Sequence, residues 1–266
     1  MHDREIDDLL IPILDHLRLH KPGSIAGVYL YGSTVESGLR PDSDVDLLML
    51  TRRSLTDAER DALTTTLLDT SGWKGHAARF PDVANRRPLD VTSLVVSELH
   101  PLTTRPRRDF QFGEWLREQI LAGSQLRPTH DPDVVVLVAA ALHAHRVLQG
   151  PELTTLVDPV PTALLRHAQL ALIPELTDNL IGDERNTLLT LARILVTTET
   201  GKTVPKDLAA TLVAPQLAQE QRWLLERARQ EHLGNCRVDW AGESERAMQL
   251  AKTMVSLLEA TGRPQT

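Results

Sequence analysis

The stretch "LYGSTVESGLRPDSDVDLLML", residues 30–50, decides the fold. The Gly-Ser pair Gly32 and Ser33 ends one apolar run, and two aspartates, Asp44 and Asp46, open the next one. Side chains two residues apart in a strand point to the same face, so we expect the two carboxylates to project side by side. Carboxylates that close repel each other unless a proton or a cation lies between them. The stretch therefore predicts two strands that carry an acidic site.

The residue types of this site suit nucleotide chemistry. Carboxylates are the hard ligands that Mg²⁺ prefers, and substrate phosphates usually complete the coordination of that ion. At Gly32 and Ser33, backbone N–H groups and a hydroxyl could hold phosphate oxygens, and a side chain in place of Gly32 would block close approach. Asp44 and Asp46 could instead be solvent-facing acids. The apolar run of residues 47–50, however, predicts a strand buried on both faces, where unpaired acids are costly, and this favours function.

A third carboxylate is expected on a neighbouring strand, where it could take a proton from an attacking hydroxyl or share the metal. Asp90, in "LDVTSLVV" (89–96), is the candidate. Taken alone, Asp90 would be an ordinary turn residue at the end of a strand. Its catalytic interpretation depends on the preceding Gly-Ser and Asp-x-Asp pattern.

Length, charge and cysteine content exclude several classes of protein. The chain has 266 residues, 41% of them hydrophobic, enough for one large domain or two ordinary ones. Its formal charge of -7 has the wrong sign for binding nucleic acid and suits a cationic small molecule. Cys236 is the only cysteine, which favours a reducing compartment. With an acidic N-terminus and no long apolar run, the sequence predicts a cytoplasmic protein without a membrane partner.

The pattern of elements changes along the chain. The first half alternates helices and strands, whereas helical periodicity dominates from about residue 132 onward, and the Gly- and Pro-containing stretch 150–161 is the best linker candidate. We therefore expect an α+β protein, with a mixed-sheet domain at 1–156 and an all-helical bundle at 157–266. The elements expected in the first half are helices over 4–18 and 57–70 and strands over 25–31, 44–50 and 89–96.

Together, the residues "YGS...SDVDLL" resemble the nucleotidyltransferase superfamily signature. The blocks "LYGSTVESGLRPDSDVDLL", "FGEWLRE", "GDERNTLLTLARI" and "TGKTVPKDLAA" look like those of the aminoglycoside adenylyltransferases that inactivate spectinomycin and streptomycin. The resemblance spans about residues 27 to 210. It implies an N-terminal nucleotidyltransferase domain, a C-terminal helical domain, an active site in the cleft between them, and transfer of AMP from Mg-ATP to one antibiotic hydroxyl. Those hydroxyls would be the 9-hydroxyl of spectinomycin and the 3''-hydroxyl of streptomycin.

The resemblance also implies roles for individual residues. Asp44, Asp46 and Asp90 would be the catalytic carboxylates and the ligands of two Mg²⁺ ions. Gly32 and Ser33 would belong to the nucleotide site. The other positions it implies are Ser43, Arg193 and Lys206 for ATP and Trp115, Asp183 and Asp178 for the antibiotic.

Several of these residues have a structural alternative. Trp115 could be a core residue of an amphipathic helix, and Asp183 could be the N-cap of its helix. Arg193 and Lys206 could lie on a solvated helix face. The basic segment "TTRPRRD" (103–109) could steer phosphates, but we interpret it as a solvated turn.

Two positions depart from the family pattern. Many members have Glu where this chain has Asp90, so the carboxylate is retained on a side chain shorter by about one methylene. Members that accept streptomycin carry Trp and Asp where an ungapped alignment places Pro174 and Asn179, and Asp178 is one residue away. The sequence therefore favours spectinomycin over streptomycin.

Two other functions compete with this interpretation. The chain could be a nucleotidyltransferase acting on another small alcohol or on a protein hydroxyl, but its "FGEWLRE", "GDERN" and "PKD" blocks are typical of the drug-modifying group. It could also be a non-catalytic binding protein, which the intact Gly32, Ser33, Asp44 and Asp46 set disfavours. We expect a monomer, because nothing in the sequence indicates an obligate interface.

Overall fold

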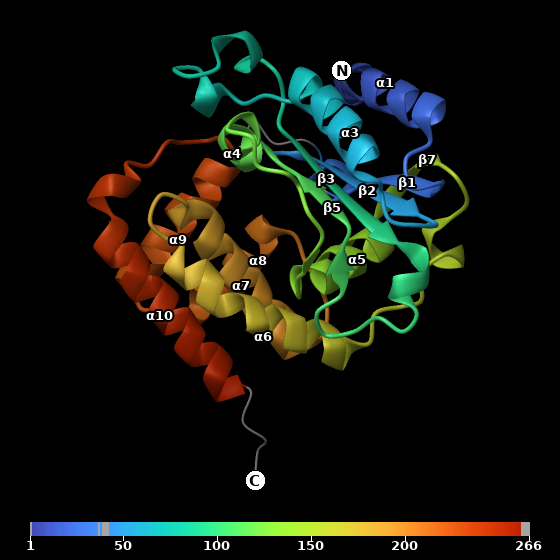
Figure 1. Cartoon of the computed structure of the whole chain (residues 1–266). Helices are drawn as coiled ribbons and strands as arrows, with labels where there is room; N and C mark the ends of the chain where they lie inside the picture. The colour runs from blue at the N-terminus through green and yellow to red at the C-terminus, as the bar shows by residue number, and fades with distance from the viewer. Residues whose placement is uncertain (1, 37, 39–42, 262–266) are drawn as a thin grey trace. The chain divides into compact units, whose positions relative to one another are not determined.

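The computed structural model describes residues 2–36, 38 and 43–261 (Figure 1). Part of the quoted decisive stretch, residues 37 and 39–42, lies outside this set. The chain forms two compact units that divide between Val160 and Pro161. The domain boundary expected after residue 156 stays a prediction. Each unit has a core of its own.

The first unit is built on a mixed five-stranded sheet with the order β5-β3-β2-β1-β7. β1 pairs antiparallel with β2 and β7, β2 pairs parallel with β3, and β3 pairs antiparallel with β5. A separate antiparallel pair joins β4 to β6. The strands are β1 (Ile25–Tyr31), β2 (Val45–Thr51), β3 (Leu89–Val95), β4 (Arg107–Arg108), β5 (Phe110–Phe112), β6 (Thr129–His130) and β7 (His145–Gln149).

Helices cover both faces of this sheet. α1 (His2–His20) and α3 (Asp57–Thr70) lie side by side over one face, as Figure 1 shows, and α5 (Asp133–His143) packs on the other. Alternate strand residues divide between the two cores. Val45, Leu47 and Met49 of β2 enter the core under α1 and α3, whereas Leu48 and Leu50 enter the core under α5.

The first half of the chain follows the predicted elements closely. β1 and α3 have the expected bounds, and the three predicted strands differ by at most one residue at either end. α3 begins at the predicted capping box: Thr56 accepts a hydrogen bond from the Glu59 backbone N–H, and Glu59 accepts one from the Thr56 N–H. Two short helices of this unit are α2 (Ser33–Glu36) and α4 (Arg117–Leu121).

The expectation that strands end before residue 132 is wrong. α5 ends at His143, and residues 145–149 form β7, which pairs with β1 and completes the sheet. This strand directly follows a helix and is only five residues long, so helical periodicity extends over it in the sequence. The stretch predicted as linker also contributes to the first unit, where Leu153 and Val157 are buried in the core under α5.

The second unit is all-helical, as predicted. α7 (Glu184–Thr200) is its central helix and packs against the other four helices. These are α6 (Thr162–Asp178), α8 (Lys206–Val213), α9 (Gln219–His232) and α10 (Ser244–Thr261). The apolar residues of α7 are buried. Because a central helix has neighbours on several sides, its apolar residues are spread over more than one face. Among the described residues, no helix is both long and apolar enough to cross a bilayer.

Candidate active site

Asp46 and Asp90 lie directly beside each other on adjacent parallel strands. In the register of β2 and β3, Asp46 is the partner of Asp90, and across β1 it is the partner of Tyr31. Strands are about 4.8 Å apart in a sheet, so partners in register that share a face have neighbouring side chains. Asp46 and Asp90 alternate with residues that enter the core under α1 and α3, which places both carboxylates on the α5 face. The predicted third carboxylate is therefore next to the Asp-x-Asp pair.

Gly32 is required at its position by this arrangement. Its φ is +72°, a conformation that favours glycine, and a Cβ atom there would lie 2.2 Å from Asp46 Oδ2. Any side chain would therefore collide with the carboxylate. Ser33, the next residue, is partly buried and begins α2. Because residue 32 is a glycine, the backbone that follows β1 can lie in direct contact with the Asp46 carboxylate.

Asp44 lies one residue before β2 rather than inside it, a shift of one residue from the expected strand. It is partly buried, and its charge acts on Asp90. Burial, and after it the Asp44 carboxylate, raises the pKa of Asp90 to about 7, with Asp133 adding to the effect and Arg108 opposing it. A carboxyl with a pKa near neutrality can act as a general base at physiological pH.

Two residues of this site were not predicted. Tyr31 is 6% exposed, and burial together with Asp46, Asp90 and Asp133 raises its pKa well above the usual value, so the phenol stays neutral. Arg108 is 4% exposed and donates hydrogen bonds to Gln111 (2.7 Å) and Asp133 (2.6 Å), with Asp131 2.9 Å away. The interpretation of 103–109 as a solvated turn is therefore wrong for Arg108.

Of these two residues, only Tyr31 has a recognisable signal in the sequence. Tyr31 immediately precedes the Gly-Ser pair, and strand alternation places it on the face of Asp46. Arg108 carries no comparable signal, because its acidic partners lie more than twenty residues later and only the fold brings them together.

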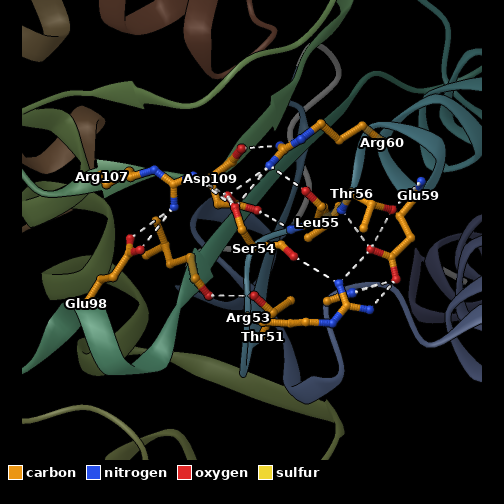
Figure 2. Close-up of polar contacts among 12 residues, drawn as sticks. Thr51, Arg53, Ser54, Leu55, Thr56, Glu59, Arg60, Glu98, Arg107 and Asp109 are labelled. Atoms are coloured by element: carbon orange, nitrogen blue, oxygen red, sulfur yellow. Dashed lines mark hydrogen bonds and ion pairs between the residues drawn. The ribbon is translucent and has the colours of Figure 1, made fainter.

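A second buried network holds Asp109, the residue that follows Arg108 (Figure 2). Asp109 is fully buried and accepts hydrogen bonds from the Leu55 backbone N–H (2.9 Å), from Arg60 (2.9 Å) and from the Ser54 hydroxyl. Arg107 also lies 3.0 Å from the same carboxylate. Arg108 and the adjacent Asp109 thus bind two different sets of partners, which fixes the backbone that carries Arg108.

The predicted ATP contact Ser43 and the predicted antibiotic contact Trp115 have different surroundings. Ser43 is buried immediately before Asp44, and its carbonyl accepts a hydrogen bond from Arg87 (3.2 Å). Trp115 lies in the short helix Glu114–Leu116 and is 51% exposed. Its alternative role as a core residue is therefore wrong, and its ring is accessible to a ligand.

Two of the residues expected in the helical unit, Lys206 and Asp183, are connected through Asn186 at the start of α7. Lys206, the first residue of α8, donates a hydrogen bond to Asn186, whose amide donates to Asp183 (3.0 Å). Asp183 occupies the N-cap position of α7 but makes no side-chain capping bond, so its carboxylate faces Asn186 instead. Arg193 lies two turns beyond Asn186 on α7, hence on the same side of the helix.

Arg193 and Lys206 are both partly buried, so neither belongs to a fully solvated helix face. Asn186 was not singled out from the sequence, although it belongs to the "GDERN" block. The neighbouring Glu184 is buried and accepts hydrogen bonds from Gly182 N–H (3.1 Å) and the Ser244 hydroxyl (3.0 Å), which fixes the turn that carries Asp183.

Asp178 and the two positions that depart from the family pattern lie at the end of α6. Asp178 is its last residue, Asn179 is the C-cap, and Pro174 is inside the helix. All three are exposed. The Asn179 amide donates to the Glu175 carbonyl (3.1 Å), so it acts locally as a helix cap.

The donor set fits Mg²⁺ only in part. Among the residues that the structure describes, no group of three or more His, Cys, Asp and Glu side chains is arranged to hold a metal ion. Within the same residues, Asp90 Oδ1 is buried and has no hydrogen-bond partner, which leaves an acceptor for a cation or a water molecule. Mg²⁺ is commonly held by one or two carboxylates plus substrate phosphates, and the adjacent acids of β2 and β3 suit that mode.

Comparisons with known proteins agree with this geometry. Residues 13–97 match the family described as "Nucleotidyltransferase domain", and residues 155–256 match "Aminoglycoside adenylyltransferase, C-terminal domain". The chain is 38% identical to a spectinomycin 9-adenylyltransferase of Staphylococcus aureus, covering 90% of this chain and 89% of that protein. It is 35% identical to an aminoglycoside (3'') (9) adenylyltransferase of Shigella flexneri, covering 86% of each.

A solved structure shows the same fold. The spectinomycin adenyltransferase AAD(9) of Enterococcus faecalis, crystallised with ATP and spectinomycin, superimposes with a TM-score of 0.87 at 29% identity. The match covers 95% of this chain and 98% of that one. The mixed sheet and the helical unit are thus both shared with a protein whose crystals hold the two substrates.

Proposed function

Because the chain belongs to the aminoglycoside adenylyltransferase family, we propose that it transfers AMP from ATP to the 9-hydroxyl of spectinomycin and so confers resistance to this antibiotic. The observation that carries the proposal is the adjacency of Asp46 and Asp90 beside the Gly32 turn. This arrangement offers a metal ligand, a base and a close backbone approach within one site.

In this reaction Asp90 takes the proton from the antibiotic hydroxyl. The hydroxyl oxygen then attacks the α-phosphorus of ATP, a new oxygen–phosphorus bond forms, and the bond to the bridging oxygen breaks so that pyrophosphate leaves. The pKa of Asp90, about 7, supports this role because a base in that range is substantially ionised at neutral pH and still accepts a proton. Tyr31 stays neutral, so its hydroxyl can donate a hydrogen bond but does not act as a base.

Mg²⁺, when bound, would neutralise the charge that develops on the triphosphate. Asp44 and Asp46 are the residues proposed to hold it, with Asp90 as a third ligand. The orphaned Oδ1 atom of Asp90 supports this assignment. Ser33 and Ser43 are proposed to contact ATP phosphates. Ser33 directly follows Gly32 in the turn, and Ser43 directly precedes Asp44.

For the helical unit, we propose that Arg193 and Lys206 bind the nucleotide and that Asp183 binds the antibiotic. Arg193 and Lys206 are partly buried, which supports a ligand role for them over a solvated helix face. Asp183 is exposed, and a carboxylate pairs well with the ammonium groups of these drugs. Trp115 is proposed to contact the antibiotic through its exposed ring.

The first experiment is mass spectrometry of spectinomycin and streptomycin, each incubated with the purified protein, ATP and Mg²⁺. We expect a gain of one AMP on spectinomycin alone. A gain on both drugs would show that Pro174 and Asn179 do not prevent streptomycin use. No gain on either drug would overturn the proposed substrate class. The same reaction with Asp46→Asn controls for a contaminating activity.

A further inference from the structure

Glu114 and Trp115 are adjacent in the sequence but lie in opposite environments. The Glu114 side chain is buried at 4% exposure, whereas Trp115 is 51% exposed. The Trp115 ring folds back over Gly113, where an added Cβ atom would lie 2.2 Å from the ring. The exposed Trp115 ring thus lies against the backbone at Gly113, and the buried Glu114 is the residue between the two.

The Glu114 carboxylate is fixed by two hydrogen bonds from one arginine. Arg117 donates through Nε to Oε2 (2.9 Å) and through Nη2 to Oε1 (2.8 Å), and His76 Nδ1 lies 3.3 Å from Oε2. Burial alone would raise the pKa of Glu114, but the hydrogen bonds from Arg117 and Ser71 outweigh it and hold the pKa below its usual value. Glu114 is therefore ionised and bound in a two-point geometry that resists rotation.

This network extends to the strand that carries the proposed base. The fully buried Ser71 hydroxyl donates to Glu114 and accepts a hydrogen bond from the Leu89 backbone N–H (3.0 Å). Leu89 immediately precedes Asp90 in β3. Arg117 Nη2 also donates to the Leu68 and Ser71 carbonyls at 3.0 Å each, which ties the end of α3 to the same group. A continuous set of buried polar contacts thus connects the Trp115 segment to the first residues of β3.

We propose that Glu114 is a positioning residue for antibiotic adenylylation: through Arg117 and Ser71 it fixes the Trp115 ring relative to Asp90. The inference rests on the proposed function, because it assigns the network to the antibiotic side of that same site. Trp115 would present its face to the drug while Asp90 takes the hydroxyl proton, and an error of about 1 Å between the two can lower the rate of such a reaction a hundredfold.

A purely structural role for Glu114 makes a different prediction. Removing the carboxylate would then lower the melting temperature without changing the kinetics of the folded protein. The chain provides a matched control in Glu118, which lies in α4, is about half exposed and pairs with Arg79 at the surface. Glu118→Gln should leave both stability and kinetics near those of the wild type.

The kinetic experiment is a double-mutant cycle of Glu114→Gln with Trp115→Ala, assayed well below the melting temperature. We expect Glu114→Gln to raise KM for spectinomycin about tenfold with little change in KM for ATP, and to add almost nothing in the Trp115→Ala background. The proposal would be overturned if the effects of Glu114→Gln and Trp115→Ala on KM for spectinomycin were independent and simply multiplied in the double variant. It would also be overturned if Glu114→Gln raised KM for spectinomycin and KM for ATP equally. If Glu114→Gln does not fold, Ser71→Ala breaks the link to β3 and keeps the Glu114–Arg117 pair.

A spectroscopic experiment separates this inference from the proposed function. In protein labelled with 5-fluorotryptophan, the Trp115 resonance is assigned with Trp115→Phe, and Gly113→Ala provides a positive control for a displaced ring. We expect Glu114→Gln to shift or broaden the Trp115 resonance while Trp223 and Trp240 stay unchanged, and Glu118→Gln to alter none of them. An unchanged Trp115 resonance would overturn the positioning role even if spectinomycin is adenylylated. A shifted resonance in a protein that does not modify spectinomycin would overturn the proposed substrate alone.

Discussion

Asp46 on β2 and Asp90 on β3 are register partners in a parallel pair, and both face α5. Two acids so placed cannot both ionise without a compensating charge, because their repulsion and partial burial favour a bound proton or cation. The one nearby cation that the pKa of Asp90 reflects is Arg108, which is already engaged by Asp131 and Asp133. The pKa of Asp90 is accordingly raised, and its buried Oδ1 atom has no hydrogen-bond partner among the residues that the structure describes.

Asp46→Asn should abolish AMP transfer without unfolding the protein. The amide keeps the shape of the carboxylate but loses its charge, so we expect the rate to fall about a hundredfold or more, while relief of repulsion leaves the melting temperature equal or higher. Steady-state kinetics and thermal unfolding test this pair of outcomes. Asp82→Asn, at an exposed acid of the same unit, is the control and should change neither. A higher melting temperature with full activity would mean that the acids are not catalytic.

The contribution of Asp90 to stability should fall as pH rises. Its pKa is about 7 in the folded protein, owing first to burial and then to Asp44, against about 4 in the unfolded chain. Between these values the folded state holds a proton that the unfolded state has released, so the contribution is complete below about pH 4 and lost as pH passes 7. The test compares unfolding free energies of wild type and Asp90→Asn, without nucleotide or metal, from pH 5 to 8.

Mg²⁺ should stabilise the folded protein more at high pH than at low pH, which is opposite to the pH dependence that protonation of Asp90 gives. The ion binds the ionised carboxylates, so it should stabilise the wild type more at pH 8 than at pH 5.5, and less in Asp90→Asn. Thermal unfolding with and without Mg²⁺ measures the difference. An equal effect at both pH values would remove Asp90 from the metal site.

Asp109→Ala should be strongly destabilising, because the network of Figure 2 would lose its central acceptor. Arg60, whose side chain is 8% exposed, would keep a buried charge without its carboxylate, and breaking such a pair typically costs about 3–5 kcal/mol. Chemical denaturation measures the loss. The exposed pair of Asp15 with Arg18 is the contrast, and Asp15→Ala should cost at most about 0.5 kcal/mol.

Streptomycin use should be gained by restoring the family residues at the end of α6. Pro174→Trp with Asn179→Asp replaces two exposed side chains, so the fold should tolerate both changes. We expect AMP transfer to streptomycin to appear or to rise at least about tenfold, because an acid there could pair with a guanidinium group of the drug. Asn179→Asp with Pro174 retained separates the contribution of the acid. A double variant as inactive on streptomycin as the wild type would place the specificity elsewhere.

The sequence by itself determined the features that depend on neighbouring residues: the bounds of β1 and α3, the capping box at Thr56, the Gly-Ser turn and the Asp-x-Asp pair. Strand alternation and helix capping are local, so they can be recognised from spacing alone. The helical second unit followed from periodicity in the same way. β7 was missed because five residues after a helix carry too short a pattern to separate strand from helix.

Only the tertiary structure decided which distant groups act together. The register of β2 against β3 placed Asp90 beside Asp46, and Arg108 became buried because Asp131 and Asp133 accept its hydrogen bonds and ion pairs. Glu114 was likewise connected to Leu89 through the Ser71 hydroxyl. Register and burial depend on how whole strands and helices pack, and a buried polar group must find its partner wherever the fold brings one, so no local pattern in the sequence records these pairs.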